Sequence, residues 1–292
     1  MLINIKYLVI TVISIFLAMG IGIFMGAQLD SQSIVVKQQE TLISKIEQQF
    51  DELSKTNAAM QNEIKNLMDK NTMNETYIKN IFPDYINGKL AGEVIAVIKT
   101  TQDYDFAGVE QVLEMAGAHI PAVITVTDKL VEAGDEELNS LMNYFGAKRN
   151  QDVGNLTAQK IIEALTQGKI QDLERLKQDG YIEVSGNFDA APGYVVICGG
   201  SKKKTVKSEV LDVPLIKSLK ASGLTVVGVE TGSAVNSYMD IYKKQKISTV
   251  DNVDTVIGQT SLVLVLSGKP GNYGVKSSAR SLMPELGGEG EK

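Results

Sequence analysis

The sequence predicts an α/β protein with an N-terminal transmembrane helix, a coiled-coil stalk and a Rossmann-like domain whose sheet is mainly parallel. Three observations predict it: an uncharged run from Tyr7 to Leu29, a seven-residue apolar repeat after it, and alternating apolar and amphipathic stretches beyond Gly92. The expected parts are a cytoplasmic N-terminus (1–6), a membrane helix (7–29), a coiled coil (30–82), an extracytoplasmic α/β domain (88–286) and a disordered tail (287–292).

Composition excludes several classes of function. The 292 residues carry a formal net charge of -6 with both signs mixed throughout, which disfavours nucleic acid as a partner. Cys198 and His119 are the single cysteine and histidine, so one chain can form neither a disulfide nor a Cys/His zinc site. Cys198 lies in an apolar run and is expected to be a buried core residue, and His119 is expected to be structural.

The run from Tyr7 to Leu29 is long enough to cross the apolar core of a bilayer as a helix. It is too long for a typical cleaved signal peptide, so we expect an uncleaved signal anchor and a single-pass protein of the cell membrane. Lys6 lies on one side and Lys37 and Lys45 on the other, so charge gives little information on orientation. The short N-terminal flank favours an extracytoplasmic C-terminal domain.

Small residues recur every fourth position within the membrane helix, at Ala18, Gly22 and Gly26. Such a face allows two helix backbones to approach closely, so it is a candidate dimer contact. Glycine is also common in membrane helices, and incidental spacing is the alternative.

A heptad repeat fits the chain from Val36 to Ile81, with no glycine or proline inside it. A repeat this long is typical of a supercoiled pair of helices. The expected seam residues of its central part are Ile43, Ile46, Phe50, Leu53, Asn57, Met60, Ile64 and Leu67.

Asn57 occupies a central a position of this repeat. Paired asparagines satisfy each other only when they are level, which predicts a parallel homodimer in fixed register. The alternative is a stalk that folds back on its own domain. Pro83 and Gly88 are expected to end the helix.

In the C-terminal domain, apolar β-branched runs predict strands and the stretches between them predict helices. The expected strands are 93–98, 122–126, 194–198, 224–229 and 262–266. The expected helices are 106–116, 136–145, 157–166, 170–179, 214–221 and 233–244.

Ligands of such folds bind beyond the carboxyl ends of the strands, where the loops of this chain are polar and rich in glycine. The candidate crevice residues are Asp128, Gly199, Gly200, Ser201, Thr231 and Gly232. The alternative is that the glycines only form tight turns.

No loop contains a complete nucleotide-binding or catalytic motif, so we expect no enzyme activity and no evident cofactor. Lys202, Lys203, Lys204 and Lys207 form a basic cluster. It is expected to be a solvated loop, with lipid headgroups or an anionic polymer as alternative partners.

Three strings resemble the mycobacterial copper-transport protein B (MctB) family: Phe16–Gly26, Ile247–Asp254, and Leu262–Leu266 followed by Asn272-Tyr273-Gly274. The resemblance implies an envelope protein linked to copper ion transport or homeostasis, with copper as a metal on this basis alone. Relatives in other bacteria resemble partners of cell-division and wall-remodelling systems.

The chemistry of the residues themselves favours a scaffold over direct copper transport. Copper(I) prefers thiolate, thioether or imidazole ligands, but Met115, Met142, Met239 and Met283 have no metal-binding spacing. One membrane helix per chain forms no pore by itself. A dimeric, non-catalytic scaffold or regulator of envelope or division machinery is therefore the alternative to copper transport.

Overall fold

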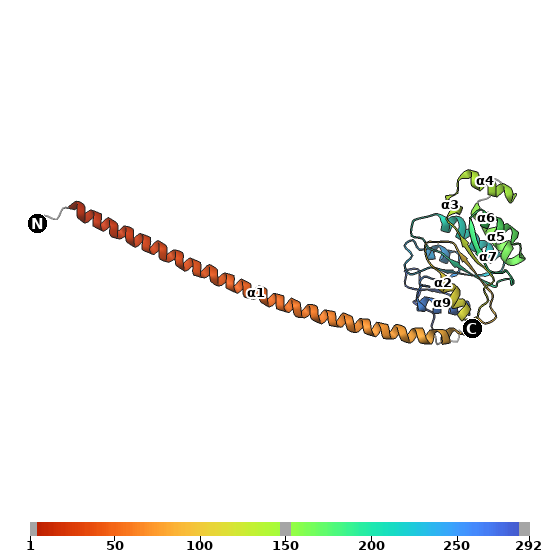
Figure 1. Cartoon of the computed structure of the whole chain (residues 1–292), viewed down its shortest axis with the longest axis horizontal. Helices are drawn as coiled ribbons and strands as arrows, with labels where there is room; N and C mark the ends of the chain where they lie inside the picture. The colour runs from red at the N-terminus through yellow and green to blue at the C-terminus, as the bar shows by residue number, and fades with distance from the viewer. Residues whose placement is uncertain (1–4, 147–152, 286–292) are drawn as a thin grey trace. The chain divides into compact units, whose positions relative to one another are not determined.

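A single helix, α1, runs from Ile5 to Ile86 and contains both the uncharged run and the heptad repeat (Figure 1). The computed structural model describes residues 5–146 and 153–285. The expected tail 287–292 and residues 1–4 of the expected N-terminus lie outside them. Two units are distinguished, Met1–Asn74 and Glu75–Lys292, and the second contains all the strands of the described chain.

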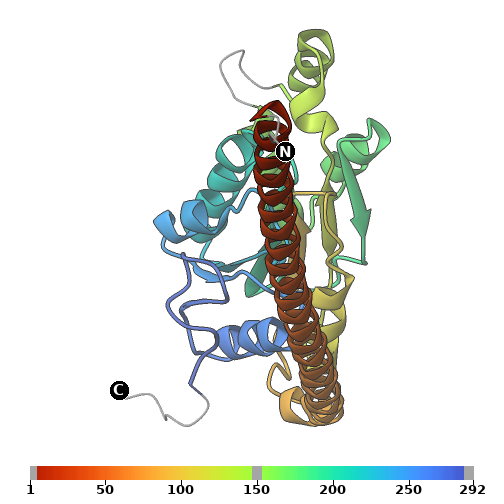
Figure 2. The same cartoon turned by 90° about the vertical axis from the view of Figure 1, so that its left-hand side faces the viewer.

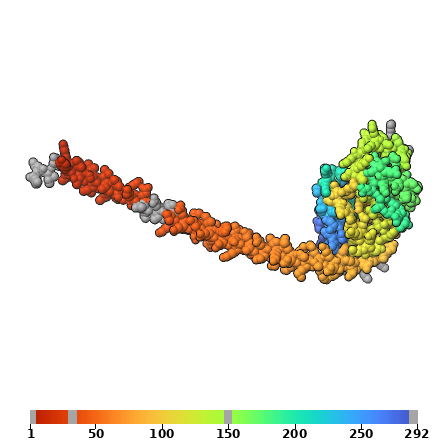
Figure 3. All heavy atoms as spheres, viewed as in Figure 1, coloured from red at the N-terminus to blue at the C-terminus, as the bar shows by residue number. Residues whose placement is uncertain are grey.

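In the first unit, the helical segment Ile5–Gln28 is long and apolar enough to cross a membrane. This confirms the predicted N-terminal apolar helix. The side chains of residues 36–74 are exposed along one helix, as the space-filling view shows (Figure 3). The heptad residues of this segment are therefore exposed to solvent in the single chain.

The prediction that Pro83 ends this helix is wrong by about one turn. Pro83 lies inside α1, which ends at Ile86, and Gly88 then adopts a φ of +73°. Ile86 is fully buried and packs with Leu90 and Phe82 in an apolar cluster of the second unit. Burial of these side chains stabilises the last turn despite the proline.

The second unit contains a seven-stranded sheet in the order β3-β2-β1-β4-β5-β6-β7. Every neighbouring pair is parallel except β2 and β3, which are antiparallel. The strands are β1 (Ile95–Lys99), β2 (Val123–Val126), β3 (Ile182–Ser185), β4 (Tyr194–Cys198), β5 (Thr225–Val229), β6 (Ser248–Val250) and β7 (Asn272–Tyr273). This confirms the α/β fold with a mainly parallel sheet.

Helices cover both faces of the sheet because its central strands bury apolar side chains alternately on the two sides. In β1, Ile95 and Val97 pack toward α2 (Ala107–Met115) and α9 (Val256–Leu266). Ala96 and Ile98 join the opposite cluster. Figures 1 and 2 show α9, drawn in blue, well separated from the teal helices of the other layer.

The opposite layer contains α5 (Val153–Gln167), α6 (Gln171–Gln178), α7 (Val213–Ala221) and α8 (Met239–Lys244). A π-helical turn, η1 (Ser208–Asp212), leads directly into α7. Two further helices, α3 (Lys129–Glu132) and α4 (Asp135–Tyr144), follow β2.

The predicted strand at 262–266 is wrong, because these residues form the second half of α9. A continuous apolar run fits a buried strand and a buried helix equally well. The hydroxyl of Thr255 accepts a hydrogen bond from the Gly258 backbone N–H and caps the start of this helix. The other four predicted strands are confirmed, whereas β3, β6 and β7 were not predicted.

Five of the predicted helices are confirmed to within a few residues, but the one expected at 233–244 begins only at Met239. Asn236 exchanges two backbone hydrogen bonds with Ser201, at 3.1 and 2.9 Å. Residues before the helix are therefore held as a loop against the end of β4.

Two glycines form a slot for the buried ring of Tyr242. An alanine Cβ at Gly199 would overlap the Tyr242 hydroxyl, and one at Gly228 would overlap its ring. Tyr242 itself is fully buried. The absence of side chains at Gly228 in β5 and at Gly199 just after β4 thus leaves room for a phenol group under the sheet.

The change Gly228→Ala is expected to lower the free energy of unfolding by about 1–3 kcal/mol, because the added methyl group overfills this slot. Gly193→Ala is the matched control, since its Cβ would meet no atom within 4 Å. Urea unfolding of both variants measures the effect. Equal stabilities of the two variants would contradict the proposed packing.

Candidate functional site

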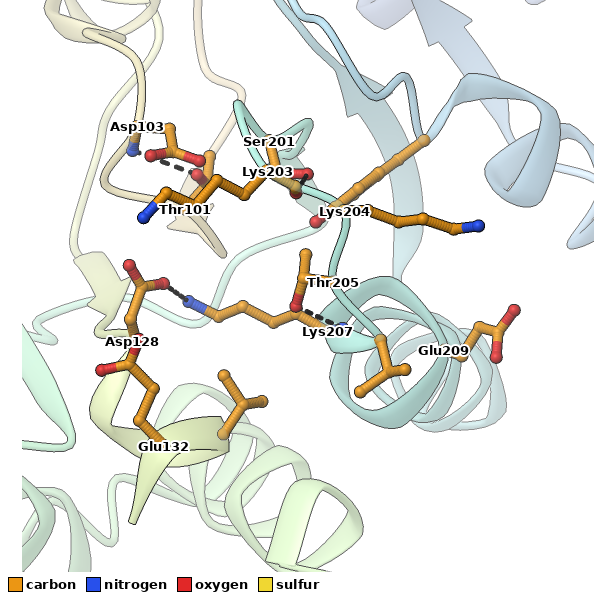
Figure 4. Close-up of a pocket in the computed structure, with 13 residues that line it drawn as sticks. Thr101, Asp103, Asp128, Glu132, Ser201, Lys203, Lys204, Thr205, Lys207 and Glu209 are labelled. Atoms are coloured by element: carbon orange, nitrogen blue, oxygen red, sulfur yellow. Dashed lines mark hydrogen bonds and ion pairs between the residues drawn. The ribbon is translucent and has the colours of Figure 1, made fainter.

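The candidate site lies where the order of strands reverses. β1 continues to β2 on one side, whereas β4, which pairs with β1, continues to β5 on the other. In open α/β sheets, ligands bind outside the carboxyl ends of the strands at this switch point. A pocket of about 710 Å³ lies here, with lining residues contributed by the segments after β1, β2 and β4 (Figure 4).

Three strand ends contribute side chains to this switch-point pocket. Thr101 and Asp103 follow β1, Asp128 follows β2, and Ser201 follows β4. The Asp103 carboxylate accepts a hydrogen bond from the Lys202 backbone N–H at 2.8 Å. This bond joins the loops that follow β1 and β4.

Lys207 is the buried cation of the pocket, with a side chain only 3% exposed. Its ammonium donates to the carbonyls of Val126 at 3.0 Å and Thr127 at 3.2 Å, and to Oδ1 of Asp128 at 3.0 Å. It thus satisfies acceptors at the carboxyl end of β2 and fixes Asp128. The expectation that Lys207 belongs to a solvated basic loop is wrong.

Asp212 is fully buried at the start of α7 and does not line the pocket. One of its oxygens, Oδ2, accepts hydrogen bonds from the hydroxyls of Tyr242 and Thr100, the latter at 3.0 Å. Burial raises the pKa of Asp212 to about 7, although these hydroxyls and Lys207 act in the opposite direction. The carboxyl group therefore gains a proton far more readily than an exposed aspartate.

Tyr238 lines the pocket and is 3% exposed. Burial raises its pKa to about 12, and the carboxylates of Asp212, Asp103 and Asp128 act in the same direction. Its hydroxyl is buried and forms no hydrogen bond of normal geometry with a described residue. Ser201 lies near this hydroxyl without forming a bond of normal geometry with it. The phenol is thus protonated at neutral pH and available to donate.

The structure brings only part of the predicted crevice into the pocket. Asp128 and Ser201 line it, whereas Gly199 and Gly200 directly follow β4 and lie beside Tyr242 and Ala234. Thr231 and Gly232 follow β5, where the Gly232 N–H donates to Asp254 at 2.7 Å. These last two residues belong to a neighbouring polar cluster.

That neighbouring cluster is centred on Glu230, whose side chain is fully buried and paired with Lys276 at 2.6 Å. Burial raises the pKa of Glu230, and the Lys276 ammonium opposes this shift. Asp251 accepts hydrogen bonds from the backbone N–H groups of Val275 and Lys276 at 2.7 and 3.0 Å. These contacts fasten the segment after β7 to the ends of β5 and β6.

The α/β domain, called the head below, has one cysteine and one histidine as candidate ligands for copper, and both lie apart from the pocket lining. Cys198 is fully buried at the end of β4, and burial raises the pKa of its thiol. His119 is half exposed and contacts Asp189 at 2.8 Å, which lowers the pKa of that aspartate. Within residues 5–146 and 153–285, no group of three His, Cys, Asp or Glu side chains is arranged to hold a metal ion.

The predicted contact residues of α1 are all exposed in the single chain. The seam residues Ile43, Ile46, Phe50, Leu53, Met60, Ile64 and Leu67 each have more than half of their surface accessible. Asn57 is exposed as well. Ala18, Gly22 and Gly26 lie on α1 one turn apart, and a Cβ at either glycine would meet no atom within 4 Å.

Sequence analysis missed Lys207, Asp212, Tyr238 and Tyr242 as members of the site. Tyr238 and Tyr242 are spaced by four residues, which places them on one helix face. Asp212 directly precedes Val213-Pro214, a helix-start signal. These signals locate a helix start and a helix face, but they do not indicate that both meet at the end of β4.

The stability of the chain is expected to depend on pH through Asp212. The pKa of Asp212 is about 7 in the folded chain and about 4 when unfolded. The protonated carboxyl group therefore stabilises the fold fully below about pH 4, and this stabilisation is lost as pH rises to about 7. Asp212→Asn cannot ionise, so the stability of this variant does not fall in that range. The free energy of unfolding of the variant minus that of the natural chain should rise by about 1.4 kcal/mol per pH unit between pH 4 and 7 and then level off.

Urea unfolding at a series of pH values measures this difference. Asp254→Asn is a suitable control, because Asp254 accepts a hydrogen bond at 2.7 Å outside the Asp212 cluster. A pH-independent difference for Asp212→Asn would contradict the account.

Comparison with known proteins places this architecture in a family. The family described as "Copper transport outer membrane protein, MctB" matches residues 2–284. Proteins named "Copper transporter MctB" from Mycobacterium bovis and from Mycobacterium tuberculosis H37Rv are each 22% identical over 319 aligned positions, covering 96% of this chain and 99% of theirs. The match includes α1 and the sheet, so the chain belongs to the MctB family.

Proposed function

We propose that the chain acts in copper homeostasis at the cell envelope, as a membrane-tethered and non-catalytic protein. The observation that carries this proposal is the family match over residues 2–284, which includes the apolar helix, the heptad repeat and the α/β head. The relatives named as copper transporters share this full length. We further propose that the α/β domain that follows the apolar helix is extracytoplasmic, since long C-terminal domains translocate largely regardless of their charge.

The donor chemistry of the head favours an indirect role over tight binding of copper. Copper(I) prefers thiolate, thioether and imidazole ligands. The Cys198 thiol is buried within the sheet, and the raised pKa disfavours its thiolate form. The one histidine contacts a carboxylate at the surface. We propose that copper is the cargo of a system in which this chain organises other components.

A strain lacking this chain is expected to grow less well in elevated copper than the same strain complemented with it. Complementation with Cys198→Ala should restore growth fully, because a buried thiol is replaced by a small apolar group and no metal ligand is lost. Growth curves over a copper series measure this, with the amount of protein in the membrane fraction as control.

Equal copper tolerance with and without the chain would contradict a role in copper homeostasis. Failure of Cys198→Ala at normal protein levels would contradict the indirect role.

A second candidate function is a dimeric scaffold for envelope or division machinery. The exposed apolar seam favours it: Phe50 is 70% and Leu53 58% exposed in the single chain. An isolated helix with such a stripe is poorly stable in water, whereas pairing buries the stripe. Level pairing also brings the Asn57 amides together, which fixes a parallel register.

The change Ile64→Asp is expected to abolish the dimer, because it places two facing carboxylates in the seam. Asn66→Asp is the matched control, since it adds the same charge on the opposite side of the repeat. Light scattering coupled to size-exclusion chromatography of the full chain in detergent measures the mass. A monomeric natural chain, or an Ile64→Asp variant that remains dimeric, would contradict the scaffold proposal.

A further inference from the structure

We propose that the switch-point pocket binds a small zwitterionic ligand, one that carries both an ammonium and a carboxylate group, such as a short peptide. This inference goes beyond the copper and scaffold roles and depends on neither. It is based on the charges that line the pocket, on one buried donor without a partner, and on the position of the pocket in the sheet.

The lining residues carry both signs of charge, with carboxylates and lysines on facing walls. Figure 4 shows Asp128 and Glu132 on one wall and the segment Ser201–Lys204 on the opposite one. The side chain of Lys203 extends toward the side of Asp103 and Asp128 (Figure 4). Its ammonium forms no ion pair with a described residue, so it is available to a carboxylate.

The acidic wall is available to a cationic group. Lys207 engages only Oδ1 of Asp128, and this aspartate remains half exposed. Glu132 makes no ion pair with any residue that the structure describes. An ammonium group placed here meets one preoriented carboxylate and one free carboxylate, and such charge-assisted hydrogen bonds are short and strong.

Two simpler ligand classes fit less well. Four carboxylates line the pocket (Asp103, Asp128, Glu132 and Glu209) against three lysines, of which Lys207 is already bonded to three acceptors. That balance repels a phosphate dianion. A divalent cation needs several converging oxygen ligands, and the described side chains form no such group.

Tyr238 supplies the second, independent observation. The residue lines the pocket, and its buried hydroxyl forms no hydrogen bond of normal geometry with a described residue, although Ser201 lies near it. A buried donor left unpaired costs free energy, which a ligand acceptor in the pocket would recover. The ligand carboxylate is therefore placed on the side of the pocket lined by Tyr238 and Lys203, where a small shift of the buried ring would let its hydroxyl donate.

The volume of about 710 Å³ lies within the range of small-molecule pockets and exceeds what a single ion requires. The polar groups of a short peptide match a lining in which charged and hydroxyl side chains predominate. The position beyond the ends of β1 and β4 is where this type of sheet binds its ligands.

The test is calorimetric titration of the full chain in detergent micelles with L-alanyl-L-alanine and with its N-acetylated and C-amidated forms. The dipeptide is expected to bind with a Kd of about 1 mM or tighter, and removal of either terminal charge should weaken binding about tenfold or more. Equal binding of all three forms, or no binding of the dipeptide at about 10 mM, would overturn the proposal.

Two variants distinguish a ligand contact from a structural role. Tyr238→Phe removes only the unpartnered hydroxyl, so the unfolding temperature should be unchanged or higher while affinity for the dipeptide falls about tenfold. Lys203→Gln should weaken the dipeptide and leave binding of the C-amidated form unchanged.

The matched controls are Tyr144→Phe on α4 and Lys217→Gln on α7, both exposed and outside the pocket. Unchanged affinity in Tyr238→Phe and Lys203→Gln, or equal losses in the controls, would overturn the assigned site.

Discussion

The hydrogen bonds around the buried carboxyl group of Asp212 join segments that are far apart in the sequence. Thr100 at the end of β1 and Tyr242 on α8 both donate to one of its oxygens. Tyr242 reaches this position only because Gly199 and Gly228 leave room beneath the sheet. The loops that border the pocket are built on these strand ends and helix starts, so its shape depends on a buried polar cluster as much as on apolar packing.

Hydrophobic periodicity predicted those strands and helices that are determined by the local pattern of side chains. The central strands bury both faces and therefore appear as continuous β-branched runs, and most helices were located from their amphipathic spacing. The same reasoning misplaced 262–266, where Thr255 caps a buried helix. It also missed β6 and β7, which are short and pair through Thr249 and Asn272. The two sequence strings Ile247–Asp254 and Asn272–Gly274 are thus brought side by side by a contact that no local pattern reveals.

The candidate site was predictable in location but not in composition. Rules for parallel sheets correctly indicated the strand ends, and Asp128 and Ser201 do line the pocket. Lys207 appeared to belong to an exposed basic run, yet its ammonium is bonded to the end of β2. Only the folded chain shows that one lysine of that run is buried while Lys203 remains free. The sequence alone does not show whether a lysine has a structural role or is available to bind a ligand.

The central claim is that the head is a ligand-binding domain whose site is the switch-point pocket. Hydrogen exchange with mass spectrometry, on the full chain with and without L-alanyl-L-alanine, tests it most directly. The account predicts slower exchange in the loops that follow β1, β2 and β4, with little change in β6 and β7. Unchanged exchange in those loops at saturating dipeptide, or protection confined to another surface, would contradict it.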